Sequence, residues 1–352
     1  MLTVKQKIEK LCLSVFSLIP IKQNRIAFIC YNCTQYSCNP KYITEYLYEK
    51  YGNKFELVWY YDDKGLLDIM PSYVKKYKKN SIGYFITLST ASIVISNVTL
   101  PRVVSFRKKQ KKINTWHGTA FKGDNNSHGN NYNRFDLFLA ENELTCKVLR
   151  KKNSFNYQGE IRKIGMPRND ILINADKRKN EEIKKNIGIK TQERILLYAP
   201  TFRDNKYSAK DGFKIQNFMN FDKMRDKLGE NYVILFRAHY FISGRIDFSK
   251  YAGFVYDVSN VEDVNELYVI SDILITDYSS VFFDYANLKR PIIFYMYDYE
   301  EYKNELRDFY IDVNELPGRI VRDENELADA IEGSLNDFNV DNKYLQFNNK
   351  FN

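Results

Sequence analysis

The chain has 352 residues, a length that leaves room for two domains. Of these residues 44% are hydrophobic and 28% are charged, and the 28 tyrosines and 24 phenylalanines exclude an intrinsically disordered chain. Its net charge of +9 is uneven, because residues 1–175 carry +15 and residues 176–352 carry −6. A basic half attracts nucleic acid, anionic lipid or a polyanionic substrate, and since no nucleic-acid-binding motif is recognisable, the last two are favoured over nucleic acid and over an inert solvated surface.

The first predicted element is a helix over residues 11–19, Leu-Cys-Leu-Ser-Val-Phe-Ser-Leu-Ile. This stretch is too short to span a bilayer, which needs about 20 apolar residues. No small-residue cleavage site follows it, which argues against a secretory signal. We expect either an interfacial amphipathic helix or a helix packed on the first domain, and the sequence leaves both open.

Short apolar runs rich in Ile, Val, Phe and Tyr recur along the chain and alternate with helical segments. Continuous runs of this kind are typical of strands that are covered on both faces of a parallel sheet, so an α/β fold is predicted. The predicted strands are 26–30, 56–60, 92–96, 113–116, 136–140, 161–164, 195–198, 232–236, 253–256, 273–276, 292–295 and 319–321.

A polar, lysine-rich stretch at 174–194 separates the strands into two sets, and we place the domain junction near residue 175. This predicts two doubly wound, Rossmann-like domains, 1–175 and 176–352, that face each other across a cleft. The last predicted helix, 324–336, could pack on either domain. Ligands of open α/β sheets bind at the carboxyl ends of the strands, so polar residues that follow strands are the candidate site residues.

The five cysteines do not predict a disulfide framework, because their number is odd and the chain is large. Cys30, Cys33 and Cys38 are closely spaced, but no second pair and no nearby histidine complete a zinc site. We therefore expect buried thiols and no metal centre.

His117 is the first candidate for chemistry. The segment 114–122, Asn-Thr-Trp-His-Gly-Thr-Ala-Phe-Lys, closes the predicted strand 113–116 and places His117 at its end, where Gly118 permits close approach of the backbone. A neutral imidazole, with an ordinary pKa of about 6.5, can take a proton from an attacking hydroxyl near neutral pH. The alternative is a structural histidine.

Arg237 and His239 follow the predicted strand 232–236. Side chains two residues apart on an extended backbone point to the same side, so these two are expected to converge on one spot. The planar guanidinium of arginine suits phosphate oxygens, and the pair is therefore predicted to stabilise a phosphoryl group. The alternative for Arg237 is a salt bridge to a carboxylate or a contact with a helix.

Two further polar segments follow predicted strands. Thr201 and Arg203 come after the strand 195–198 and could line the same cleft. The predicted strand 273–276 ends in the segment Thr-Asp-Tyr-Ser-Ser at 276–280. Ser279 and Ser280 of this segment are expected to cap a helix whose start forms an anion site. Plain helix capping is the alternative, and it explains one serine better than it explains the whole run.

These segments together are similar to one known family. They are Thr-Trp-His-Gly-Thr at 115–119, Gly-x-Pro-Arg-Asn-Asp at 165–170, Tyr-Ala-Pro-Thr-Phe-Arg-Asp at 198–204, Arg-x-His at 237–239, Thr-Asp-Tyr-Ser-Ser-Val-Phe-Phe-Asp-Tyr-Ala at 276–286 and Lys-Arg-Pro-Ile-Ile-Phe-Tyr at 289–295, with Asn39-Pro40-Lys41 upstream and Asp298 and 305–310 downstream. In this order they resemble the CDP-glycerol:glycerophosphate glycerophosphotransferase family of teichoic acid synthesis.

The resemblance implies a GT-B-like fold whose second domain holds the donor nucleotide, and transfer without a required metal. No cofactor is expected. By the same resemblance, His117 corresponds to the candidate base of the family, and Arg237 and His239 correspond to its donor-phosphate contacts.

The resemblance also groups the remaining site residues. Donor or phosphate binding is expected of Thr201, Arg203, Asp277, Ser279 and Ser280, the last three around the pyrophosphate-binding helix start. The family often has Thr-Pro-Leu-Lys where this chain has Thr-Ala-Phe-Lys, so a local change is expected there. Acceptor-side or structural roles are expected of Trp116, Gly118, Thr119, Lys122 and Arg168.

The expected reaction moves glycerol phosphate or ribitol phosphate from CDP-glycerol or CDP-ribitol to a lipid-linked glycan acceptor and releases CMP. The basic first domain is expected to meet the anionic membrane surface, as a peripheral protein on the cytoplasmic face. Polymerising members often carry a long additional N-terminal region, and its absence here favours a single-unit transferase. Two alternatives stay open: a GT-B glycosyltransferase or epimerase that uses a UDP-sugar, and a non-catalytic polyanion- or membrane-binding protein.

Overall fold

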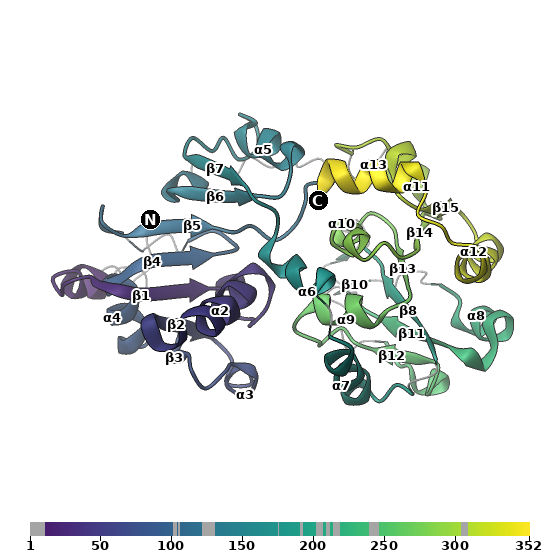
Figure 1. The fold of residues 1–352 in the computed structure, drawn as a ribbon, viewed down its shortest axis with the longest axis horizontal. Helices are drawn as coiled ribbons and strands as arrows, with labels where there is room; N and C mark the ends of the chain where they lie inside the picture. The colour runs from purple at the N-terminus through teal and green to yellow at the C-terminus, as the bar shows by residue number, and fades with distance from the viewer. Residues whose placement is uncertain are drawn as a thin grey trace. The chain divides into compact units, whose positions relative to one another are not determined.

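The computed structural model of the chain consists of two α/β units (Figure 1). Unit 1 comprises Met1–His117 and Asn125–Asp170, and unit 2 comprises Gly118–Asp124 and Ile171–Asn352. The sequence did not indicate that the short segment beginning at Gly118 belongs to unit 2. The residues that the structure describes are 11–100, 104, 106–121, 131–174, 176–190, 193–201, 207–208, 212–213, 219–238, 246–303 and 309–352.

Unit 1 is built on a seven-stranded sheet in the order β3-β2-β1-β4-β5-β6-β7, in which all neighbouring strands run parallel. The order reverses between β1 and β4, which makes this pair the topological switch point of a doubly wound sheet. The strands are β1 (Lys22–Ile29), β2 (Glu56–Tyr61), β3 (Lys75–Lys78), β4 (Ala91–Ser96), β5 (Lys111–Asn114), β6 (Leu137–Ala140) and β7 (Glu160–Lys163).

Helices pack on the sheet of unit 1, α4 on β1, β3 and β4, and α5 on β6 and β7. Ser81 and Asn142 begin these two helices, and each side chain accepts a main-chain N–H of the first turn. The helices are α2 (Cys38–Tyr51), α3 (Leu66–Ile69), α4 (Ile82–Thr90), α5 (Glu143–Arg150) and α6 (Asp170–Ile173), which spans the unit boundary, with the short 3₁₀ helices η1 (Tyr31–Cys33), η2 (Gly52–Lys54), η3 (Tyr132–Arg134) and η4 (Pro167–Asn169).

The first described residues, 11–16, are helical, as expected. Leu13 is buried, and Nη1 of Arg107 donates to two main-chain carbonyls just after the helix, at 2.8 Å each. The segment is therefore attached to unit 1, yet it also presents an apolar surface. Across the described residues, helices fall short of the length and apolar character that crossing a membrane requires. The exposed apolar side chains of the segment are Leu11, Val15, Leu18 and Ile19.

Unit 2 contains a six-stranded parallel sheet in the order β12-β11-β8-β13-β14-β15. This order repeats the pattern of unit 1, with the switch point between β8 and β13. The strands are β8 (Arg194–Ala199), β11 (Tyr232–Phe236), β12 (Val255–Asp257), β13 (Ile273–Thr276), β14 (Ile292–Tyr295) and β15 (Arg319–Val321), and a separate antiparallel pair consists of β9 (Tyr207–Ser208) and β10 (Gly212–Phe213).

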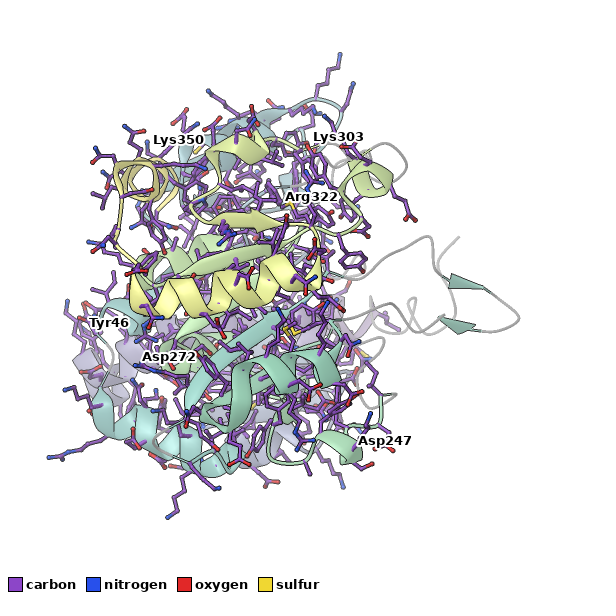
Figure 2. All side chains as sticks on the ribbon, turned by 90° about the vertical axis from the view of Figure 1, so that its right-hand side faces the viewer. Tyr46, Asp247, Asp272, Lys303, Arg322 and Lys350 are labelled. Carbon is purple, nitrogen blue, oxygen red and sulfur yellow. The ribbon has the colours of Figure 1, made fainter. Side chains whose placement is uncertain are left out.

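The helices of unit 2 include one that the sequence analysis missed, α13, so the prediction that 324–336 is the last helix is wrong. Phe347 and Phe351 of α13 pack on Phe283, and Lys350, labelled in Figure 2, pairs with Glu315. The preceding helix packs on α8, β14 and β15. The helices are α7 (Lys177–Ile187), α8 (Phe221–Leu228), α9 (Val264–Ile270), α10 (Val281–Tyr285), α11 (Tyr299–Glu301), α12 (Glu324–Asn336) and α13 (Asn342–Phe351), with η6 (Gly229–Asn231), η7 (Ser249–Tyr251), η8 (Ala286–Leu288) and η10 (Val313–Glu315).

Each of the twelve predicted strands overlaps an observed strand, which confirms the α/β fold class. The strand β3 was missed because its sequence is Lys-Lys-Tyr-Lys. Among the described strands it lies at the edge of the sheet and pairs with β2 alone, so it does not need the apolar run of a strand that is buried on both faces.

Candidate active site

His117 lies in a tight turn that follows β5. The strand ends at Asn114, two residues earlier than predicted, and Trp116 has a left-handed backbone with φ 54°. Oδ1 of Asn114 accepts the main-chain N–H of Trp116 at 2.7 Å, which stabilises the turn. The N–H of Thr115 donates to the main-chain oxygen of Ser96 at the end of β4, at 2.8 Å. The turn therefore holds His117 at the carboxyl edge of the sheet.

The imidazole of His117 has one defined tautomer. Its Nδ1 lies 2.7 Å from the main-chain oxygen of Asn97, and because a carbonyl oxygen only accepts, Nδ1 carries the proton and Nε2 carries the lone pair. Burial lowers the pKa of His117 to about 4; the bond to Asn97 opposes this, and the charge of Arg168 adds to it. The imidazole is therefore neutral at neutral pH and can accept a proton at Nε2.

The switch point of unit 1 lies beside this histidine. The main-chain N–H of Tyr31, just after β1, donates to Oδ1 of Asn97, just after β4, at 2.9 Å. Asn97 thus joins two strand ends through its side chain and orients His117 through its main chain. Tyr31, Asn32 and Cys33 are consecutive left-handed residues with φ of 42°, 59° and 76°. Such residues cost roughly 1–3 kcal/mol each and cluster at functional sites.

Arg168 lies in the same region of unit 1. It belongs to η4, is only 4% exposed, and places Nη1 3.4 Å from Sγ of Cys38 at the start of α2. Its positive charge acts on the imidazole of His117. The structure therefore brings together residues of two motifs that the sequence had singled out separately, Trp116 and His117 of one and Arg168 of the other.

Thr201 and Asp277 meet at the switch point of unit 2. Thr201 follows β8, Asp277 follows β13, and the main-chain N–H of Thr201 donates to Oδ1 of Asp277 at 2.8 Å. The same oxygen accepts the N–H of Tyr278 at 2.5 Å, and Asp277 is only 3% exposed. A carboxylate repels phosphate, so these bonds suit a residue that shapes the loop. In both units, therefore, a hydrogen bond from a main-chain N–H to a side-chain oxygen links the two strand ends at the switch point.

Ser280 does not cap α10 with its side chain, so this part of the sequence prediction is wrong. Ser280 occupies the N-cap position, but its φ of −74° and ψ of 1° differ from the extended conformation of a capping residue, and its hydroxyl makes no capping bond. Its Oγ lies 3.2 Å from the point where a Cβ on Gly118 would stand. The close approach predicted at Gly118 is therefore an approach to Ser280. Ser279, beside it, is half-buried.

Arg237 follows β11, and its guanidinium binds main-chain oxygens. Nη1 donates to the oxygen of Val258 at 3.1 Å and to that of Val261 at 2.7 Å. Its main-chain N–H donates to the oxygen of Tyr198 at the end of β8, at 2.9 Å. These bonds attach the loop after β12 to the carboxyl edge of the sheet, so Arg237 has a structural role whether or not it also binds a ligand.

The residues that follow His117 belong to unit 2. Thr119 is buried, and Phe121 packs on Phe282 and Phe309, with ring centroids 5.1 and 5.0 Å away. The Thr-Trp-His-Gly-Thr motif therefore contains the first of the points at which the chain passes from one unit to the other, between His117 and Gly118.

Several predicted contacts fall on residues outside those that the structure describes. These residues are Lys122, Arg203 and His239, together with His128, for which the sequence indicated no role. The convergence of Arg237 with His239 therefore stays a prediction.

The closely spaced cysteines are buried thiols. Burial raises the pKa of Cys30 well above its usual range and that of Cys33 to about 12, so both thiols are protonated at neutral pH. None of the five cysteines forms a disulfide. Within the described part of the chain, His, Cys, Asp and Glu side chains do not gather in groups of three or more that could hold a metal ion.

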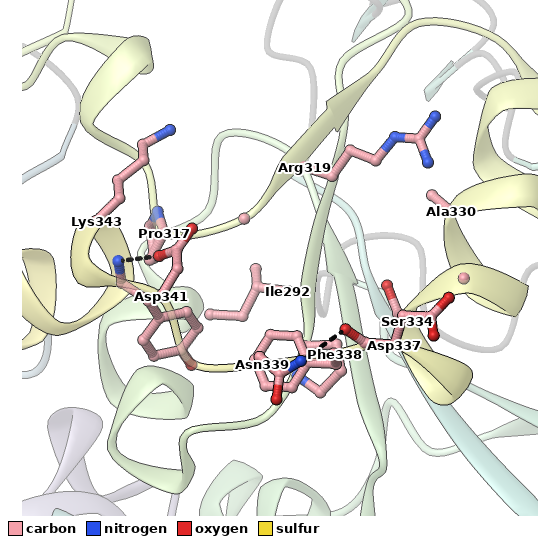
Figure 3. A pocket seen from close by; sticks show the side chains of 14 residues that line it. Ile292, Pro317, Arg319, Ala330, Ser334, Asp337, Phe338, Asn339, Asp341 and Lys343 are labelled. Atoms are coloured by element: carbon pink, nitrogen blue, oxygen red, sulfur yellow. Dashed lines mark hydrogen bonds between the residues drawn. The ribbon is translucent and has the colours of Figure 1, made fainter.

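A cavity of about 410 Å³ lies at the amino ends of β14 and β15 (Figure 3). Its lining includes Ile292, Arg319, Phe338 and Lys343 and contains none of the predicted site residues. The predicted residues of unit 2 follow the carboxyl ends of its strands, so this cavity is at the opposite edge of the sheet from them.

Comparison with known proteins identifies the family of the chain. The profile of the CDP-Glycerol:Poly(glycerophosphate) glycerophosphotransferases matches residues 11–352. The chain belongs to this family. The glycerophosphotransferases are enzymes, so the chain is an enzyme. The two interpretations that the sequence had left open, a UDP-sugar enzyme and a non-catalytic polyanion- or membrane-binding protein, are therefore disfavoured.

Two curated glycerophosphotransferases resemble the chain over most of its length. It is 34% identical over 368 residues to the teichoic acid poly(glycerol phosphate) polymerase of Bacillus spizizenii, covering 97% of this chain and 92% of that protein. It is 34% identical over 358 residues to the teichoic acid glycerol-phosphate transferase of Staphylococcus aureus, covering 94% and 89%. Some relatives are longer, and the chain spans 47% of the poly(glycerol phosphate) polymerase of Bacillus subtilis.

A solved structure of a glycerophosphotransferase has the same fold. It is the wall teichoic acid polymerase TagF, as a histidine-to-asparagine variant soaked with CDPG, and it matches at 32% identity with a TM-score of 0.85 over 100% of this chain and 94% of that chain. This match confirms the GT-B-like fold that the sequence resemblance implied.

Two residues of this glycerophosphotransferase, Asn97 and Tyr31, were not predicted from the sequence. Both signals were present, because Asn97 directly follows the predicted strand 92–96 and Tyr31 directly follows 26–30. The rule that found Thr201, a polar residue after a buried strand, applies equally to them.

Proposed function

We propose that this chain transfers glycerol phosphate, or ribitol phosphate, from the matching CDP-polyol to a lipid-linked glycan acceptor of teichoic acid or a related cell-surface polymer, and that it releases CMP. The observation that carries the proposal is the family match over residues 11–352, which includes His117 as a neutral imidazole at a strand end. The names of the relatives and the CDPG soak of TagF support a CDP-glycerol donor.

The proposed step is an attack of an acceptor hydroxyl on the β-phosphorus of the CDP-polyol. A bond forms between the acceptor oxygen and the β-phosphorus, the bond from that phosphorus to the bridging oxygen breaks, and the bridging oxygen leaves with CMP. Nε2 of His117 takes the proton of the attacking hydroxyl. The bond from Nδ1 to Asn97 keeps the lone pair on Nε2 and stabilises the imidazolium that forms. A general base of this kind contributes about 10²–10⁴-fold.

We assign the donor to the second domain, 176–352, at the switch point between β8 and β13, because ligands of doubly wound sheets bind there. Phosphoryl transfer depends mainly on positioning and on charge stabilisation. In this assignment the Thr201–Asp277 bond shapes the phosphate-binding loop. The groups that donate to the phosphoryl oxygens are Arg203, Arg237, His239, Ser279 and Ser280.

We assign the acceptor and the membrane to the first domain, 1–175, which carries +15. Each basic residue near an anionic lipid surface contributes about 1 kcal/mol. The exposed leucines at 11 and 18 add apolar area to this basic domain. These features support peripheral binding at the cytoplasmic face of the membrane.

Co-sedimentation with vesicles of phosphatidylglycerol tests the membrane assignment. The full chain should bind at low salt and be released at high salt, and Leu18→Asp should weaken binding. Ile173→Asp is the matched control, because Ile173 is 71% exposed and Leu18 is 84% exposed, but Ile173 lies far from the first helix in sequence. Binding that is insensitive to salt, or equal effects of the two substitutions, would contradict the assignment.

The reaction is tested by CMP release from CDP-glycerol and from CDP-ribitol, each with a synthetic lipid-linked disaccharide acceptor, with and without one glycerophosphate unit. Release that depends on the acceptor, from either donor, supports the proposal and names the donor. Release of UDP from a UDP-sugar under the same conditions, with no CMP from either CDP-polyol, would overturn it.

A further inference from the structure

Asn39 is a buried polar residue to which the proposed reaction gives no role. It is the second residue of α2, its side chain is 0% exposed, and it opens the Asn-Pro-Lys segment that the sequence analysis singled out. A buried carboxamide needs partners for both its amide and its oxygen, so its contacts show what it does.

The amide of Asn39 binds the turn that carries His117. Nδ2 donates to the main-chain oxygen of Thr115 at 2.9 Å and to that of Trp116 at 3.2 Å. Trp116 is the left-handed residue directly before His117. The two bonds therefore hold the carbonyls of the turn on the side of α2, and the direction in which the imidazole leaves the backbone depends on them.

The oxygen of Asn39 binds the turn that carries Arg168. Oδ1 accepts the main-chain N–H of Arg168 at 3.1 Å, and Sδ of Met166 lies 3.2 Å from Nδ2. One carboxamide thus joins three segments, since its partners Thr115 and Arg168 are 76 and 129 residues away along the chain. No charged side chain could do the same, because the contacts require a donor and an acceptor on one short group.

We propose that Asn39 is a positioning residue for the transfer reaction: it fixes the turn of His117 and the turn of Arg168 in one arrangement. The proposal rests on the proposed role of His117 as the base. It gives the Asn-Pro-Lys segment a function, because its carboxamide bonds both the turn before His117 and the turn of Arg168.

Asn39→Asp is the sharpest test, because aspartate has the same size and keeps the acceptor for Arg168 but loses the donor. A carboxylate oxygen then faces the carbonyls of Thr115 and Trp116, and their repulsion displaces the turn. We expect kcat to fall by about 10- to 100-fold, as for a catalytic group that is misplaced by about 1 Å. The affinity for CDP-glycerol, measured by calorimetry, should stay that of the wild type.

Thr44→Val is the matched control for stability. Thr44 is also fully buried on α2, where Oγ1 donates to the oxygen of Pro40 at 2.8 Å and accepts from Nε1 of Trp59 at 2.9 Å. Its loss removes two buried hydrogen bonds without touching the turn of His117. We expect this variant to unfold at lower urea concentration and to keep the kcat of the wild type.

The direct readout is the imidazole of His117 in full-length protein labelled with ¹⁵N-histidine. The chain has three histidines, and His117→Gln assigns the signal. In Asn39→Asp the His117 Nδ1–H signal should weaken and the pKa of the ring should rise, because the turn moves and a negative charge is added. In Thr44→Val both should match the wild type. Asn39→Ser, which is too short to reach both turns, provides the same measurement if the aspartate variant does not fold.

The proposal is overturned if Asn39→Asp and Asn39→Ser leave the Nδ1–H signal and the pKa of His117 unchanged, or if they lower kcat no more than Thr44→Val does. Failure of the underlying function is distinguishable from this result. If His117→Ala retained full turnover, the base assignment would be lost, while the NMR spectra would still show whether Asn39 positions the histidine.

Discussion

Acidification below pH 6.5 should destabilise unit 1 through His117. In the unfolded chain the imidazole has its ordinary pKa of about 6.5, whereas burial lowers it to about 4 in the folded protein. Between these values the unfolded chain binds a proton that the folded chain does not bind. The contribution of the neutral imidazole is therefore complete above pH 6.5 and is lost as the pH falls toward 4. The difference amounts to about 3 kcal/mol in full, of which about 2 kcal/mol is lost by pH 5.

Urea unfolding followed by tryptophan fluorescence measures this loss. Both tryptophans, Trp59 and Trp116, lie in unit 1, so the signal reports the unit that contains His117. The wild type and His117→Gln are compared at pH 7.5 and pH 5, which cancels the other titrating groups. The wild type should lose about 2 kcal/mol more than the variant. Equal losses in the two proteins would refute the claim that the imidazole is held neutral by burial.

Three further predictions concern the two units separately. His117→Ala should lower turnover by about 10²–10⁴-fold and leave the affinity for CDP-glycerol unchanged in calorimetry; unchanged turnover would exclude it as the base. Asp277→Ala removes the acceptor of two main-chain N–H groups at the switch point of unit 2, so it should raise the KM for the CDP donor more than it changes the acceptor KM, and an equal rise in both would speak against a donor-site role. Gly318→Ala should destabilise unit 2 by about 1–3 kcal/mol, because its Cβ would stand 2.1 Å from the main-chain oxygen of Ile292. Gly333→Ala in α12 is the opposite case: its Cβ would meet no atom within 4 Å, so this substitution should stabilise unit 2 by about 0.5–1 kcal/mol. Circular dichroism during urea unfolding distinguishes these two changes, and a stable Gly318→Ala protein would contradict the reasoning.

The strands were predictable because a strand that is buried on both faces needs a continuous apolar run, and short aliphatic runs such as Ile-Leu-Ile at 273–275 are typical of such strands. The strand β3 was not predictable by that reasoning, because an edge strand is specified by its main-chain pairing with β2 and not by its side chains. The helix α13 was missed for a related reason, since only Tyr344, Phe347 and Phe351 form its buried stripe among polar residues.

The residues of the candidate site could be predicted where their own side chains mark them as polar residues after a strand. Residues after strands included His117, Thr201 and Asp277, and the structure places all three at strand ends. The bonds that fix them were not predictable, because most involve main-chain atoms of distant segments. The carbonyl of Asn97 could belong to any residue type, so no sequence pattern shows that it orients the imidazole.

The passage of the chain between units at His117 and Gly118 has a consequence for biosynthesis. The segment that contains Phe121 leaves the ribosome in the middle of the sequence of unit 1, but its aromatic partners Phe282 and Phe309 are synthesised much later. Until these partners are synthesised, the side chain of Phe121 cannot be buried against them. It is then an exposed apolar side chain, of the kind that promotes aggregation or binds chaperones. An N-terminal half produced alone, ending at the polar stretch near 175, would retain that exposed site permanently. The intact chain contains both Phe121 and the aromatic residues that cover it, whereas that half does not.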